Sequence, residues 1–100
     1  HGDVYGHNML ILDSTGAAKL GDFGASFYYG DLSPSAHKLV ERVEVRAFGV
    51  LCAEVATRVV GAAAMQQTLA AIADDCLRTD VAARPSFAKL VRVLGNYNVL

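Results

Sequence analysis

The feature that most restricts the fold is residues 41–59, where apolar side chains fall on nearly every face of a helix. They are Val43, Val45, Ala47, Phe48, Val50, Leu51, Val55 and Ala56. Because a helix that is apolar all round belongs in a protein interior, the sequence predicts a buried central helix, ended by Gly61. Charged residues interrupt the segment, and no apolar run reaches about 18 residues, which excludes a transmembrane helix.

The length and composition favour a single globular domain. The chain has 100 residues, of which 53% are hydrophobic and 19% are charged, and this is too apolar for a disordered protein. Its net charge of -1 gives no reason to expect nucleic acid or an anionic membrane as the main partner.

The two cysteines point to a reducing compartment. Cys52 and Cys76 have neither a Cys-x-x-Cys spacing nor histidines placed for zinc, so we interpret them as buried, reduced thiols. Together with the lack of a visible signal peptide, this favours an intracellular, cytoplasmic location. The first residue is His1 rather than methionine, and we therefore expect a fragment or a processed chain.

A short hairpin is predicted before the central helix. Residues 9–12 and 17–20 are apolar runs separated by turn residues, among which Gly16 suits a positive φ. Residues 28–35 are predicted to lack regular secondary structure, since they contain Gly30, Pro34 and serines.

Two further helices are predicted after the central helix. With the hairpin, they make the predicted fold α+β and mainly helical. The first covers residues 64–77, and its expected buried face is Met65, Leu69, Ile72, Ala73, Cys76 and Leu77. The last opens with Ser86 as N-cap or with Pro85 in the first turn. Its expected buried stripe is Phe87, Leu90, Val91 and Leu94, and Gly95 stops it. Residues 96–100 form a tail.

Three hydrogen-bond acceptors flank the hairpin. Asp3 and Asn8 precede it and Asp22 follows it, so Asn8 and Asp22 can converge at its open end. Carboxylate and carboxamide oxygens suit Mg²⁺, and Asp3 is then available as a base. The same residue types are also common turn formers, and the spacing alone leaves both readings open.

Four motifs in order resemble those of the protein kinase family. They are His1-Gly2-Asp3 with Asn8, then Asp22-Phe23-Gly24, then residues 44–49 with Glu54, and lastly residues 76–80 with Arg84-Pro85-Ser86-Phe87. The resemblance implies a mainly helical large lobe whose short β-hairpin carries the catalytic and magnesium loops. Residues 1–95 would form a partial kinase domain without the small lobe.

The resemblance also implies roles for the matched residues. Asp3 would be the catalytic carboxylate, and Asn8 and Asp22 would hold the Mg²⁺ of bound ATP. Leu10 would pack under the adenine ring. The residues with implied structural roles are His1 and Phe23 in an apolar column, Glu44 at the start of the central helix, and Arg84 as a buried arginine. If Arg84 is buried it needs an acidic partner, and Glu41 is the nearest candidate.

Several departures from the family pattern keep other functions open. Gly2 replaces the usual arginine, Tyr5 replaces a phosphate-contacting lysine, and the segment between Asp22 and Glu44 is short. The leading interpretation is an ATP-dependent kinase that phosphorylates a protein Ser/Thr or Tyr hydroxyl, with ATP, a protein substrate and the missing N-terminal lobe as partners. A pseudokinase or scaffold module and a small-molecule phosphotransferase of the aminoglycoside or choline kinase type are the alternatives.

Overall fold

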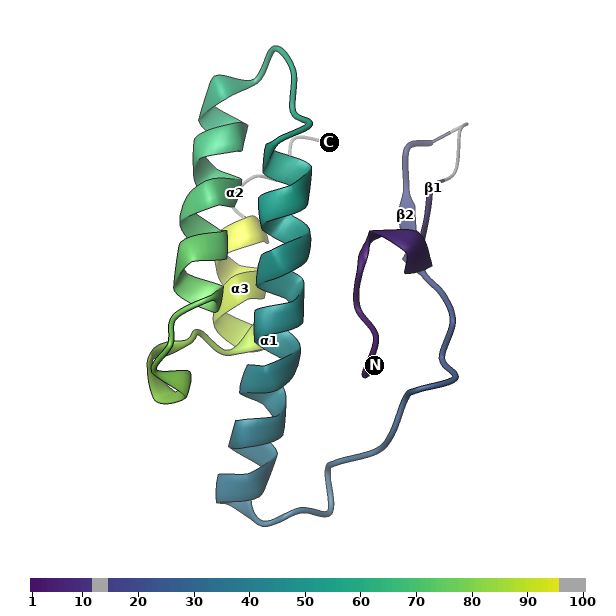
Figure 1. The fold of residues 1–100 in the computed structure, drawn as a ribbon, viewed down its shortest axis with the longest axis vertical. Coiled ribbons are helices and arrows are strands. Elements are labelled where there is room, and N and C mark those ends of the chain that lie inside the picture. The colour runs from purple at the N-terminus through teal and green to yellow at the C-terminus, as the bar shows by residue number, and fades with distance from the viewer. Residues whose placement is uncertain (12–14, 96–100) are drawn as a thin grey trace.

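The computed structural model describes residues 1–11 and 15–95. Within them lie a two-stranded hairpin and three α-helices, so the α+β, mainly helical class is confirmed. The helices run alongside one another, and the hairpin stands beside them on the other side of α1 (Figure 1). No helix in these residues is long and apolar enough to cross a membrane.

The hairpin forms as predicted. Strands β1 (Met9–Ile11) and β2 (Ala18–Leu20) pair antiparallel, with Met9 opposite Leu20. Gly16 has φ +71°, a value that only glycine adopts at little cost. Residues 12–14, which include part of the predicted strand and turn, lie outside the described residues.

Helix α1 (Pro34–Ala56) begins well before the predicted start at residue 41. The Ser33 side chain accepts a hydrogen bond from the Ala36 N–H at 3.3 Å, and Pro34 occupies the first turn. A serine N-cap followed by proline is a standard helix start. The expectation that residues 28–35 are irregular is therefore wrong for Pro34 and Ser35. The helix also ends three residues before 59, and Gly61, with φ +75°, lies in the connection to α2.

The prediction that α1 is buried on every side is wrong. One face is buried, with Val45, Cys52 and Ala56 at helical spacing, whereas Val43 is 62% exposed and Val50 and Val55 are also exposed. The described helices cover only one side of α1, and these three valines lie outside that covered face.

The core lies where α1 meets α2 (Ala63–Cys76) and α3 (Phe87–Gly95). Its buried residues are Val45, Cys52, Ile72, Ala73, Cys76 and Leu90. Gly49 allows the close approach of α2, because a Cβ at this position would lie 2.5 Å from the Cys76 Cβ. Both cysteines are buried free thiols, as predicted.

The last helix differs from its prediction at one position. The Ser86 hydroxyl accepts a hydrogen bond from the Lys89 N–H at 3.1 Å, so its predicted capping role is confirmed. Leu90 is buried, and Phe87 and Leu94 pack against the core. Val91, however, is 69% exposed, and Val93 packs inward instead. Short 3₁₀ turns, Gly6–Asn8 and Val81–Ala83, precede the hairpin and α3 respectively.

Candidate active site

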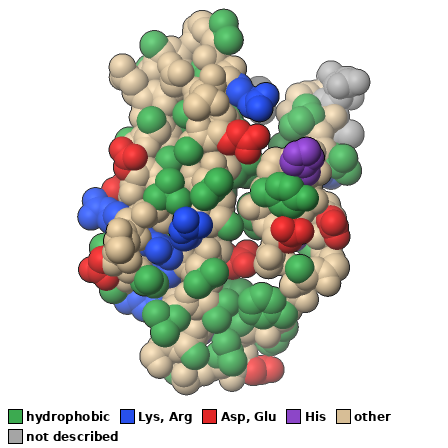
Figure 2. All heavy atoms as spheres, in the orientation of Figure 1, with side chains coloured by type: hydrophobic (Ala, Val, Ile, Leu, Met, Phe, Trp, Pro, Cys, Tyr) green, Lys and Arg blue, Asp and Glu red, His purple; other side chains and the backbone are tan. Residues whose placement is uncertain are grey.

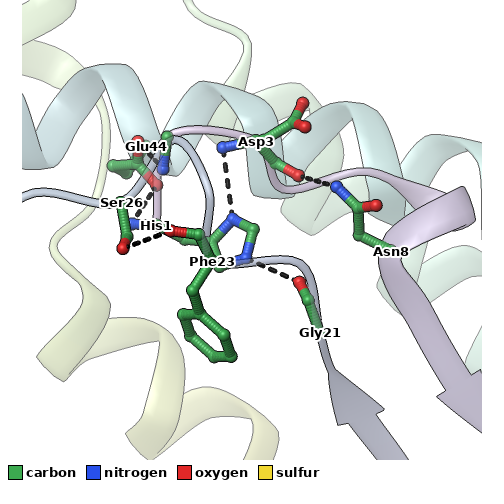
Figure 3. Close-up of polar contacts among 8 residues, drawn as sticks. His1, Asp3, Asn8, Gly21, Phe23, Ser26 and Glu44 are labelled. Carbon is green, nitrogen blue, oxygen red and sulfur yellow. Dashed lines mark hydrogen bonds and ion pairs between the residues drawn. The ribbon is translucent and has the colours of Figure 1, made fainter.

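The loop before the hairpin is fixed to the central helix by one carboxylate. Glu44, on α1, is only 7% exposed. Its Oε2 accepts a hydrogen bond from the His1 backbone nitrogen at 3.1 Å, and its Oε1 accepts one from the Gly2 N–H at 3.0 Å (Figure 3). Because both oxygens of a buried carboxylate have donors, the charge is stabilised and the loop cannot shift freely along the helix.

The Asp3 backbone is held from the other direction by Asn8. The buried Asn8 side chain donates from Nδ2 to the Asp3 carbonyl oxygen at 2.7 Å. The Asp3 carboxylate itself is exposed and points away from the His1 ring (Figure 3). The structure thus fixes the backbone of Asp3 and leaves its carboxylate facing solvent.

The hairpin brings Asn8 and Asp22 to the same end, as predicted from their spacing. The Gly21 N–H donates to the Asn8 carbonyl oxygen at 2.7 Å, so Asp22 is one residue beyond this contact. Asp22 has φ +54°, the one positive φ among the described non-glycine residues, and its Oδ1 accepts from the Gly24 N–H at 3.3 Å. Such a conformation costs free energy and is concentrated at functional sites.

The imidazole of His1 links the two halves of the site. Its Nε2 bonds the Gly21 carbonyl oxygen at 2.8 Å, and its Nδ1 faces the Asp3 N–H at 3.2 Å. Since a carbonyl only accepts and an N–H only donates, the two bonds together require the neutral ring with hydrogen on Nε2. The His1 and Phe23 rings meet edge to face at 5.0 Å. The predicted His1–Phe23 contact is present, although Phe23 is 62% exposed.

Asn8 and Asp22 offer side-chain oxygens of the kind that Mg²⁺ prefers. The Nδ2 of Asn8 is occupied by Asp3, which leaves Oδ1 available, and Asp22 retains Oδ2 as a free acceptor. In the described part of the chain there is no cluster of three or more His, Cys, Asp or Glu side chains that could hold a metal. Mg²⁺ characteristically takes one or two protein ligands and completes its shell with phosphate and water, and its binding by Asn8 and Asp22 stays a prediction.

Gly2 is required by the packing of the loop. It has φ +89°, and a Cβ at this position would lie 2.5 Å from the Ala25 carbonyl oxygen. No real side chain tolerates both the backbone conformation and this contact. At position 2 the loop therefore comes close to the segment that follows Gly24. Nothing in the sequence pattern indicates this close contact.

The predicted pairing of Arg84 with Glu41 is wrong. Arg84 is buried, as predicted, but it donates from Nε to the Arg78 carbonyl at 2.8 Å and from a terminal nitrogen to the Arg42 carbonyl at 3.1 Å. Glu41 pairs with Arg42 instead and accepts from the Phe87 N–H at 3.3 Å. Two backbone carbonyls accept from the guanidinium, and no hydrogen bond to a carboxylate is found for it among the described residues.

Leu10 lies on β1 with 65% of its surface exposed. Leu10 is two residues after Asn8, and its role under the adenine ring stays a prediction. Searches of protein-family models, of curated proteins and of solved structures gave no match to this chain.

Proposed function

We propose that this chain is the large-lobe part of an ATP-dependent protein kinase. It would transfer the terminal phosphoryl group of ATP to a Ser/Thr or Tyr hydroxyl of a protein in the cytoplasm. The observation that carries the proposal is the fixed backbone of Asp3, held by Glu44 through His1 and Gly2 and by the Asn8 side chain. Two segments distant in sequence, residues 1–8 and α1 with Glu44, meet there, and each contributes residues of the motifs described above.

In this proposal the residues have separate tasks. Asp3 orients the attacking hydroxyl and accepts its proton, and Asn8 and Asp22 hold the magnesium. The ion offsets the negative charge on the phosphate oxygens when it is bound. Phosphoryl transfer depends mostly on positioning and electrostatics, which explains why so many contacts fix this loop.

An apolar gap supports the proposal that further structure completes the fold. A space of about 400 Å³ separates the hairpin from α1. It is lined by Met9, Ile11 and Ala18 on the hairpin and by Leu51 and Val55 on the helix. Ile11 is 61% exposed there, and an isolated two-stranded hairpin is only marginally stable. In the protein kinase family a helix precedes the catalytic loop, and we propose that such a helix, together with the small lobe, lies on this side of α1.

One observation favours the second candidate, a small-molecule phosphotransferase. The sequence His1-Gly2-Asp3 is similar to the form that aminoglycoside and choline kinases prefer, and the structure requires glycine at position 2. The motifs around Glu44 and Arg84 favour the protein kinase.

The test is a mass-spectrometric phosphotransfer assay on the full-length protein with Mg-ATP, a peptide library and an aminoglycoside panel. Phosphorylated peptides are expected for the wild type. Asp3→Asn should lower the rate at least about 10²-fold, as for loss of a positioned base. Asp74→Asn, an exposed aspartate on α2, is the matched control and should leave the rate unchanged. Unchanged activity of Asp3→Asn would refute the catalytic assignment, and phosphorylated aminoglycosides alone would favour the second candidate.

A further inference from the structure

A hollow lined by aromatic rings lies on the segment between Gly24 and α1. Its volume is about 300 Å³, and its walls are Phe27, Tyr28, Tyr29, Gly30 and His37. In Figure 2, hydrophobic side chains gather over the lower part of the visible face, where this segment leads into α1. The hollow is separate from Asp3, Asn8 and Asp22, and none of the motifs described above explains it.

The rings are grouped in space as well as in sequence. Tyr29 stands 4.7 Å from the His37 ring and 6.1 Å from the Phe27 ring, measured between centroids. The planes are tilted by 56° and 52°. These rings therefore stand next to one another on the lining of the hollow, and aromatic faces carry the negative part of the ring quadrupole.

Tyr28 forms the outer wall, and Gly30 makes that position possible. The Tyr28 phenol lies directly over Gly30, where a Cβ would collide with its oxygen and ring. Tyr28 is nevertheless 82% exposed, so the ring gains little from burial in this place. An exposed aromatic ring folded over a glycine leaves its face available to a ligand.

The charges nearby favour a positive ligand. Asp31 is the single charged residue in residues 23–35. Lys38 lines a different hollow, with Leu39 and Arg42, and so does not occupy this one. A compact ammonium group is strongly hydrated, whereas a quaternary ammonium is the cation that aromatic cages recognise.

We propose that this hollow binds a trimethylammonium group, the head of a methylated lysine or of a free quaternary amine. The rings of Phe27, Tyr28 and Tyr29 supply the attraction, and Asp31 follows the lining residue Gly30 in the sequence. The proposal does not depend on phosphoryl transfer, because binding at the hollow is measured without ATP.

The experiment is an NMR titration of the full chain with tetramethylammonium and, separately, with a peptide containing trimethyllysine. The same peptide with the neutral tert-butyl carbon isostere is the control ligand. Shifts confined to residues 27–37 are expected, with the neutral peptide binding about fivefold more weakly, as for loss of an exposed cation–π contact. If the trimethyllysine peptide binds more tightly than tetramethylammonium, the natural ligand is a methylated polypeptide. If tetramethylammonium binds as tightly or more tightly, the natural ligand is a small quaternary amine.

Variants distinguish loss of the Tyr28 ring contact from a general loss of structure. Tyr28→Leu should weaken binding of the cationic ligand about fivefold, and Tyr28→Phe should restore it, since the face and not the hydroxyl makes the contact. Gly30→Ala should weaken binding because the new Cβ displaces the ring, whereas Gly95→Ala, which has nothing within 4 Å, should not. Equal binding of the neutral and charged peptides, or no shift with any ligand, would overturn the proposal.

Discussion

The side chain of Glu44 holds the loop that carries Asp3. Its two oxygens each accept a hydrogen bond from a backbone nitrogen, of His1 and of Gly2. A glutamine in its place presents one acceptor and one donor group, so an N–H of the loop would face another donor. An unpaired buried polar group costs about 1–3 kcal/mol.

We therefore predict that Glu44→Gln lowers the free energy of unfolding by about 1–3 kcal/mol. It should also speed hydrogen exchange at the Gly2 amide. The matched control is Glu54→Gln on the same helix, because Glu54 is exposed and its ion pair with Arg58 is long at 3.9 Å. That pair is worth at most about 1 kcal/mol. Urea unfolding and hydrogen exchange measure both effects, and equal losses in the two variants would contradict the role assigned to Glu44.

At the same scale, the identity of a buried residue proved easier to predict than its partner. Arg84 was expected to be buried and is. Its partner was expected to be Glu41, but the backbone carbonyls of Arg78 and Arg42 accept its hydrogen bonds instead. Any backbone carbonyl can accept from a guanidinium, and the sequence does not show which one the fold brings near.

The middle of α1 was predicted correctly, whereas its start was placed too late in the sequence. The apolar pattern located the centre of the helix but not its first two turns, where Ser35, His37 and Lys38 carry no apolar period. Ser33 and Pro34 are the actual start signal. Capping depends on one side-chain hydrogen bond, which is a local property that the apolar pattern does not register.

We predict that Ser33→Ala destabilises the chain by about 1 kcal/mol, the usual cost of losing a serine N-cap. Ser35→Ala is the control, since the Ser35 hydroxyl contacts only the Ser33 hydroxyl, at 3.4 Å, among the hydrogen bonds given for it. Thermal unfolding followed by circular dichroism gives both values. If Ser35→Ala cost as much as Ser33→Ala, the capping bond would not be the cause.

On the scale of the whole molecule, the two buried thiols couple stability to pH. Burial and, to a smaller extent, the neighbouring Cys76 raise the pKa of Cys52 from 9.0 to about 11. The pKa of Cys76 is also raised to about 11, first by burial and then by Asp75, against a lowering by Arg84. The folded state therefore keeps both thiols protonated above pH 9, where the unfolded chain releases the protons.

The free energy of unfolding should thus be unaffected by the thiols below pH 9 and fall between about pH 9 and 11. Each thiol contributes a slope of up to about 1.4 kcal/mol per pH unit. Cys52→Ala should remove one such contribution, which urea unfolding from pH 8 to 11 under reducing conditions can measure. An identical slope in the wild type and the variant would show that Cys52 does not titrate in this way.

The sequence by itself determined the local elements of this protein. The hairpin, the α2 helix and its buried face, and the capping of α3 by Ser86 follow from periodicity and turn chemistry, which act within a few residues. The convergence of Asn8 and Asp22 also followed, because a hairpin joins its own ends.

Only the tertiary structure decided which apolar residues are buried and which groups meet across the chain. Val43 and Val91 are apolar and exposed, since burial depends on which element covers a face. The Glu44 contacts to the loop, the close approach of Gly2 to Ala25 and the Tyr28 ring over Gly30 depend on distances between atoms. Hydrophobic patterning is read along one segment, whereas hydrogen bonds and close contacts need two segments in fixed positions, and only the folded chain fixes those positions.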